Sequence, residues 1–92
     1  AGFSIRSVYP NPFNPNTTIE FVLPHSMDIT LDIYNSAGQK INTLADTHFG
    51  RGSHTLLWNS CNDTGERVSA GVYIARLCGG GLITARRMLL LK

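Results

Sequence analysis

The stretch Asn16–Pro24, "NTTIEFVLP", decides the fold because its residues alternate between polar and apolar. Ile19, Phe21 and Leu23 share one side of an extended chain, while the residues between them share the other side. A period of two is typical of a half-buried β-strand, in which successive side chains point to opposite faces. No window of the chain has the i, i+3, i+4, i+7 spacing that an amphipathic helix requires. The sequence therefore predicts an all-β protein.

Similar alternation predicts strands along the rest of the chain. The further segments expected to form strands are residues 3–9, 28–35, 39–44, 54–59, 71–77 and 82–91. In the last of them, one side of the pleat carries Ile83, Ala85, Leu89 and Leu91. Gly38 supplies the positive φ of a hairpin loop at 35–39, and glycine-rich turns follow at 50–53 and 78–82. This pattern predicts an immunoglobulin-like antiparallel β-sandwich of about seven strands.

The segment Tyr9–Pro15, "YPNPFNP", holds all but one of the 4 prolines of the chain. Proline cannot donate a backbone hydrogen bond and fixes φ, so this segment cannot be a central strand. Each proline also drives the residue before it into extended geometry. We therefore expect a stiff connector between the first two strands, with Tyr9 and Phe13 packed over the edge of the core.

Size and charge indicate one small globular domain with a basic end. The chain has 92 residues, of which 42% are apolar and 15% charged, and a net charge of +2. No apolar run approaches the roughly 20 residues that span a bilayer. The last seventeen residues hold no acidic side chain, and their cations are Arg76, Arg86, Arg87 and Lys92. A short basic cluster is typical of a solvated strand face, and a patch for a partner is the alternative.

The residues of known catalytic motifs are missing. The chain has neither G-x-S-x-G nor H-E-x-x-H, and His25, His48 and His54 fall in or beside expected loops. The glycines at 79–81 precede a strand, whereas a phosphate-binding loop precedes a helix. We therefore expect no catalytic residue, no cofactor and no small-molecule substrate. A net charge of +2, with no aromatic residue after Tyr73, also argues against nucleic acid.

Two cysteines and one acidic loop raise the questions of a disulfide and a metal. Cys61 and Cys78 should lie a strand length apart, about 20 Å, whereas a disulfide needs Cα atoms within about 7 Å. We expect both thiols to be free and Trp58 to be held by packing alone. The loop 59–71 is no EF-hand, because it lacks the glycine and the final glutamate. An irregular, weak calcium site around Asn62 and Asp63 stays open.

Separate stretches of the chain, in order, resemble one family. The stretches are "YPNPFNPNTTIEFVLP", "LDIYNSAGQKINTL", "GSHTLLWNSCNDTGERVSAGVYIARL" and "ARRMLLLK". Together they resemble the type A C-terminal sorting domain of type IX (Por) secretion cargo, and the related immunoglobulin-like domain of flagellar hook-capping proteins. The positions that recur in the family correspond to Pro10, Asn11, Pro12, Gly38, Trp58, Gly65, Gly71, Tyr73, Arg76 and Lys92. Cys61 and Cys78 depart from the common pattern.

The resemblance implies a non-enzymatic address label. Residues 1–92 would be a single sorting domain at the end of a larger exported protein, with the cargo domain upstream. Its partners would be the outer-membrane translocon and its shuttle proteins, and the protein would reach the cell surface or the medium through the periplasm. We place the recognition surface on the last hairpin, where Arg76, Arg86, Arg87 and Lys92 supply charge. The apolar end of the last strand would offer an edge for a partner strand.

Two other functions compete with this interpretation. The first is a spacer or assembly module of the hook-capping type, which holds a neighbouring domain at a distance. The second is a carbohydrate-binding accessory module of a secreted glycoside hydrolase. That role needs a row of exposed aromatic side chains, and the aromatic residues, 9% of the chain, fall mostly at positions expected to face inward.

Overall fold

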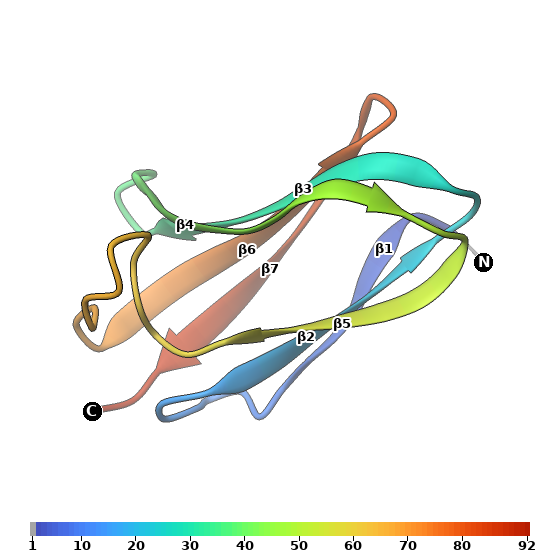
Figure 1. Cartoon of the computed structure of the whole chain (residues 1–92). Coiled ribbons are helices and arrows are strands. Elements are labelled where there is room, and N and C mark those ends of the chain that lie inside the picture. The colour runs from blue at the N-terminus through green and yellow to red at the C-terminus, as the bar shows by residue number, and fades with distance from the viewer. Residues whose placement is uncertain (1) are drawn as a thin grey trace.

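A computed structural model describes residues 2–92 and shows two antiparallel sheets packed face to face (Figure 1). The strands are β1 (Ser4–Tyr9), β2 (Thr17–Leu23), β3 (Met27–Asn35), β4 (Lys40–Phe49), β5 (Gly52–Trp58), β6 (Gly71–Gly79) and β7 (Leu82–Leu90). One sheet has the order β1-β2-β5 and the other β4-β3-β6-β7. The immunoglobulin-like sandwich that the sequence predicts is confirmed. Within residues 2–92, no helix is long and apolar enough to cross a membrane.

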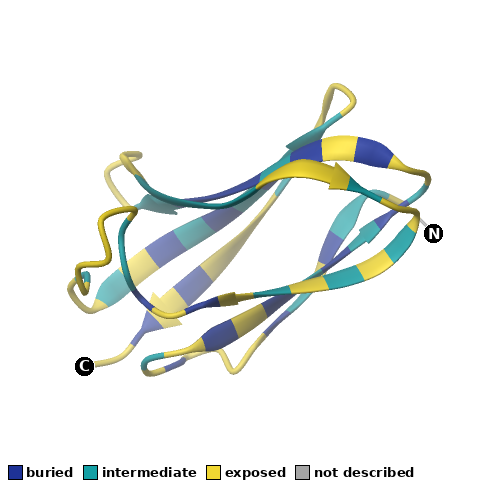
Figure 2. Cartoon of the chain, viewed as in Figure 1, coloured by how far each residue is buried: buried dark blue, intermediate teal, exposed yellow. Residues whose placement is uncertain are grey.

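The core lies between the two sheets and follows the alternation of the sequence. In β2, Ile19, Phe21 and Leu23 are at most 1% exposed, and the residues between them face outward or are half-buried. Figure 2 shows a similar alternation of buried and half-buried residues along β6. Burying a large apolar side chain contributes about 1.5–3 kcal/mol, so the inward faces of the two sheets supply most of the stability.

The turns between strands differ in what they connect. The loop 35–39 and the turn at Gly80–Gly81 close hairpins within the four-stranded sheet, as predicted, and Gly38 has a φ of 84°. The prediction for 39–44 was too short, because β4 continues to Phe49 by pairing with β3 as far as Met27. Residues 50–51 make no hairpin in one sheet; they carry the chain from β4 to β5 in the opposite sheet.

The face of β7 that enters the core is the one opposite to the predicted apolar set. Met88 and Leu90 are 1% and 4% exposed. The predicted set lies outside, where Ile83 is 62%, Leu89 39% and Leu91 47% exposed, and Ala85 is also exposed. Apolar residues occupy both faces of "MLLL", so alternation alone could not choose between them. The two-residue turn at Gly80–Gly81 determines which face of β7 enters the core, because it pairs Gly79 with Leu82 and so sets the register of the β6–β7 hairpin.

Trp58 stands at the centre of an aromatic cluster at one end of the core. Its ring lies 5.7 Å from that of Phe13 and 5.2 Å from that of Tyr73. Its indole Nε1 donates a hydrogen bond to the carbonyl oxygen of Cys61 over 2.9 Å. The expectation that packing alone holds Trp58 is therefore wrong, since a buried indole N–H needs an acceptor. The connector prediction also fails for Tyr9, which is 78% exposed, whereas Phe13 is buried.

We predict that Trp58→Ala lowers the free energy of unfolding by about 3–5 kcal/mol, because it removes the centre of the cluster and leaves a cavity. Urea denaturation followed by circular dichroism measures the change. Leu57→Ala is the matched control: Leu57 is the preceding residue of β5 and is 59% exposed, so this change should cost less than about 0.5 kcal/mol. Equal costs at the two positions would contradict the position assigned to Trp58.

Candidate functional site

The proline-rich connector lies along the free edge of β7, and Asn11 makes the first contact there. Its Nδ2 donates to the carbonyl oxygen of Arg87 over 3.1 Å, and its Oδ1 accepts from the backbone N–H of Leu89 over 3.0 Å. One amide side chain thus supplies the donor and the acceptor that a peptide group of a neighbouring strand would supply. This pairing removes two of the unpaired groups that an edge strand presents.

Phe13 continues the pairing with its own backbone. Its N–H donates to the carbonyl oxygen of Leu89 over 3.0 Å, and its carbonyl oxygen accepts from the N–H of Leu91 over 2.8 Å. Its ring is 2% exposed and packs against Trp58. The connector therefore acts as a short additional strand that lies beside residues Arg87 to Leu91. The expectation that this apolar end of β7 offers a free edge to a partner strand is wrong, because Asn11 and Phe13 already occupy it.

The other edge of the four-stranded sheet is covered in the same way by the loop between β5 and β6. The N–H of Asp63 donates to the carbonyl oxygen of Ile41 over 3.1 Å, and its Oδ1 accepts from the N–H of Thr43 over 3.0 Å. Asn42 Nδ2 adds a bond of 2.8 Å to the carbonyl oxygen of Cys61. Both covered half-edges lie at the end of the sandwich that holds this loop and the C-terminus (Figure 1).

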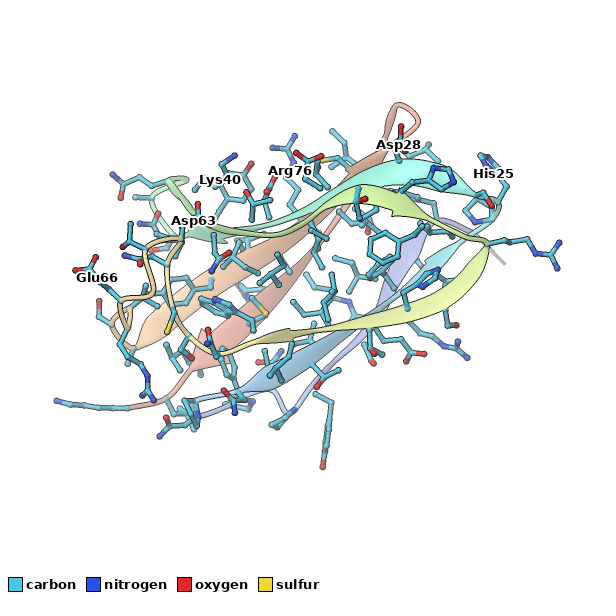
Figure 3. The ribbon with its side chains drawn as sticks, in the orientation of Figure 1. His25, Asp28, Lys40, Asp63, Glu66 and Arg76 are labelled. Carbon is cyan, nitrogen blue, oxygen red and sulfur yellow. The ribbon has the colours of Figure 1, made fainter. Side chains whose placement is uncertain are left out.

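The four predicted recognition residues do not form one cluster. Arg76 and Arg87 lie on the outer face of the four-stranded sheet, on the adjacent strands β6 and β7; Figure 3 shows Arg76 pointing away from the core. Arg86 points to the opposite side, toward β1, where its Nη2 donates to the carbonyl oxygen of Arg6 over 3.1 Å. Lys92 is exposed and lies beyond the end of β7. The structure therefore places Arg76 and Arg87 on one face of the sheet, and Arg86 and Arg87 on the lining of one hollow at the edge of β7.

Arg76 borders a groove on this outer face that the sequence prediction did not include. The groove has a volume of about 450 Å³ and is lined by Tyr34, Asn35, Ser36, Gly38, Val72, Ile74 and Arg76. The guanidinium donates to the hydroxyl of Tyr34 over 3.4 Å and lies 5.7 Å from the centre of its ring. Cys78 first, and then Tyr34, raise the pKa of Arg76 above its usual value. Because a guanidinium stays protonated in proteins, the groove has a permanent cation. The apolar residues Val72 and Ile74 on the outward side of a strand were the available signal in the sequence.

The loop 59–70 uses its polar groups to hold its own backbone. The Oδ1 of Asn62 accepts from the N–H groups of Thr64 and Glu66 over 3.1 and 2.9 Å. Hydrogen bonds from the Asn62 side chain and from Thr64 lower the pKa of Glu66. Among residues 2–92 no group of three metal-ligating side chains comes together. The Oδ1 atoms of Asn62 and Asp63 accept hydrogen bonds from backbone and side-chain donors of the protein.

A family profile, described as the FlgD Ig-like domain, matches residues 14–77. This match spans more than half of the chain. The chain belongs to the FlgD Ig-like domain family. The matched range contains β2 to β5 and most of β6, and it leaves out β1, the first half of the connector, and β7. Comparison with curated proteins finds no match.

Solved structures share the fold of this FlgD Ig-like domain at low sequence identity. Dimeric latent PorU from Porphyromonas gingivalis superposes with a TM-score of 0.76 and 20% identity, over 92% of this chain and 9% of PorU. PorZ, described as a surface component of the type-IX secretion system of the same organism, gives 0.63 and 18%, over 99% of this chain and 12% of PorZ. FlgD from P. aeruginosa gives 0.62 and 17%, over 98% of this chain and 75% of FlgD. The chain thus spans about a tenth of the length of the two Por proteins.

The remaining motif residues of this FlgD Ig-like domain shape its loops. Gly65 and Gly71 have φ values of 87° and 147°, which favour glycine. Tyr73 is 5% exposed, and its hydroxyl donates to the carbonyl oxygen of Ser69 over 2.6 Å. Pro10 and Pro12 are exposed on either side of Asn11, and the carbonyl oxygen of Pro10 accepts from the Thr17 hydroxyl over 2.7 Å. The connector is thereby held against β2 as well as β7.

Both cysteines of the domain are free thiols. Cys61 and Cys78 are partly buried, and neither forms a disulfide. The carbonyl group of Cys61, rather than its thiol, takes part in the structure, since it accepts hydrogen bonds from Trp58 and Asn42. The position therefore serves the aromatic cluster and the covered edge of β4 through its backbone.

We predict that Asn11→Ala lowers the free energy of unfolding by about 1–2 kcal/mol, because two hydrogen bonds to β7 are lost. The fluorescence of Trp58 during urea denaturation measures the change. Asn14→Ala is the control, since Asn14 is an exposed asparagine of the same connector and makes no hydrogen bond among residues 2–92. If both changes cost the same, Asn11 does not hold the edge of β7.

Proposed function

We propose that this FlgD Ig-like domain is a non-catalytic sorting label of type A, which directs a larger exported protein through the outer membrane by the type IX route. The observation that carries the proposal is that PorU and PorZ contain a segment with the fold of almost the whole chain. Two further facts support it: PorZ is described as a component of the type-IX secretion system, and the chain corresponds to a small share of both proteins. A module of this size fits the role of a label joined to a cargo domain.

The proposed partners are the translocon of the outer membrane and its shuttle proteins, with the cargo domain linked upstream. The recognition surface would lie on the outer face of β6 and β7, where Arg76 lines the groove at Tyr34 and Arg87 lies on β7 opposite Ile74 of that groove. Permanent guanidinium charges beside half-buried apolar side chains suit a protein partner with acidic and apolar groups. The protein would then pass through the periplasm to the cell surface or the medium.

A spacer or assembly module is the second candidate. The family assignment favours it, because FlgD from P. aeruginosa shares the fold over 75% of its own length. A carbohydrate-binding role has less support, since Tyr9 is the one Phe, Trp or Tyr side chain among residues 2–92 that is mostly exposed. One such ring makes no row on which a sugar chain could stack.

A secretion assay tests the sorting role. Residues 1–92 are fused to a periplasmic reporter in a host with a type IX translocon, and the reporter outside the cells is measured. We predict that Arg76→Glu combined with Arg87→Glu lowers the external reporter at least about tenfold, because the charge of the recognition surface is reversed. Deletion of residues 88–92 is a poor test, since Met88 and Leu90 belong to the core and the domain would unfold.

The matched control of this assay is Arg51→Glu. Arg51 is an exposed cation in the connection between β4 and β5, away from the β6–β7 face. This variant should leave secretion unchanged, and the unfolding curves of the purified variants should match that of the parent. Secretion of the double variant at the parent level would overturn the recognition surface, and secretion that persists without the translocon would overturn the sorting role.

A further inference from the structure

The first half of β7 is a sheet edge that the connector leaves open. Asn11 and Phe13 bind the groups of Arg87, Leu89 and Leu91 that point to the free side of the strand. Along a regular antiparallel strand every second residue directs its N–H and C=O to the same side. Because β7 pairs with β6 without a register shift, Ile83 and Ala85 must point their backbone groups to that side as well.

The open half-edge is accessible from Leu82 to Arg87. Leu82 is 48% and Ile83 62% exposed, and Ala85, Arg86 and Arg87 are exposed too. Within residues 2–92, the one hydrogen bond that crosses from here to β1 is donated by the Arg86 side chain to the carbonyl oxygen of Arg6. The outward backbone groups of Ile83 and Ala85 have no partner there. The half-edge is thus a template for one short added strand.

The side chains around this half-edge are positively charged at one end and apolar at the other, and this pattern determines which partner strand it suits. Arg86 and Arg87 lie on opposite faces of β7, so guanidinium groups flank both sides of any strand added at that point. They also border a hollow of about 660 Å³, which is lined by Asn11, Val72, Arg86, Arg87, Met88 and Leu89. No acidic residue follows Glu66 in the sequence, so β6 and β7 hold no carboxylate side chain to neutralise them. At the other end of the half-edge, Leu82 and Ile83 present apolar side chains.

We propose that the half-edge Leu82–Arg87 binds an extended acidic segment of a partner protein by antiparallel strand addition. The acidic residues of the segment lie in the hollow beside Arg86 and Arg87, and aliphatic residues follow them beside Leu82 and Ile83. Asn11 ends the added strand, because it occupies the next position along the edge. The footprint is therefore about five residues, and acidic precedes aliphatic in the partner sequence. This inference rests on the proposed role as a recognised label and names the chemistry of its partner.

A second copy of the chain is a poor occupant of this edge. Antiparallel pairing of two β7 half-edges around a two-fold axis brings Arg86 and Arg87 of both copies to one short ladder, and like charges on facing strands repel. The edge of β4 is equally unsuited to an acidic strand, since its uncovered half, residues 44–49, holds Asp46 and lies beside Asp28 of β3. The β7 half-edge therefore distinguishes acidic partners from copies of itself.

Hydrogen exchange with a synthetic peptide tests the inference. The peptide Asp-Glu-Thr-Val-Val, with blocked ends, is added to the full 92-residue chain, and amide exchange is followed by NMR. We expect the N–H groups of Ile83 and Ala85 to exchange at least about tenfold more slowly, because they gain hydrogen bonds to the peptide. The N–H groups of Leu89 and Leu91 should not change, since they are already bonded within the protein.

Variants at Ala85 separate strand addition from other kinds of binding. Ala85→Pro removes one outward N–H without breaking the ladder to β6, and we expect it to abolish peptide binding; Ala85→Ser keeps the N–H and should bind as the parent does. Arg86→Glu with Arg87→Glu should weaken binding about tenfold, as should replacement of the peptide's acids by lysines. Melting curves check that each variant is folded.

The results that would overturn the inference are distinct from those that concern sorting. Binding by Ala85→Pro at the parent affinity, or signal changes at Tyr34 and Ile74 with no protection of Ile83 and Ala85, would show docking on the sheet face instead. No binding of the peptide to the parent chain at millimolar concentration would also overturn it. If the peptide protects Ile83 and Ala85 but the reporter fusion is not secreted, the docking site stands and the sorting role fails.

Discussion

The structure depends on the contact that Phe13 makes between the connector and β7. One residue fills the core with its ring, which packs on Trp58, and closes the edge of the sheet with its backbone, which pairs with Leu89 and Leu91. A chain of 92 residues has a small core, so one buried aromatic side chain at the margin of the core supplies a large share of all the apolar surface that is buried. The prolines around Phe13 reduce the freedom of the unfolded connector, which lowers the entropic cost of ordering it. Edge closure and core packing therefore depend on the same segment.

Both edges of the four-stranded sheet are closed over half their length by loop residues, which use side-chain and backbone groups. Asn11 does this for β7 and Asp63 for β4, each with one donor and one acceptor to the strand beside it. Open strand edges promote aggregation, and loops that cover them are a common protection. The uncovered halves differ in charge, because Arg86 and Arg87 border one and Asp46 the other. One end of the four-stranded sheet is thus protected against aggregation, and at the other end the charge beside each open edge selects among partner strands.

The sequence predicted the fold well where one face of a strand is purely apolar, as in β2. It failed at "MLLL", because both faces there are apolar and the turn at Gly80–Gly81 sets the register. It ended β4 too early, because the polar residues after Leu44 are held by pairing with β3 and not by burial. The hydrogen bonds of Asn11 to β7 could not be predicted from the alternation of polar and apolar residues. Its side chain replaces the peptide group of a neighbouring strand only because the fold places β7 beside it. The basic residues were found, but their division between two faces of β7 needed the register.

Hydrogen exchange in the free protein measures the pairing of the connector with β7 most directly. If the connector serves as the additional strand, the N–H groups of Leu89 and Leu91 exchange slowly, because Asn11 and Phe13 accept from them. The N–H groups of Ile83 and Ala85, on the same side of the same strand, should exchange much faster since nothing among residues 2–92 accepts from them. Equal and fast exchange at all four positions would show that β7 has an open edge along its whole length, and would contradict the account.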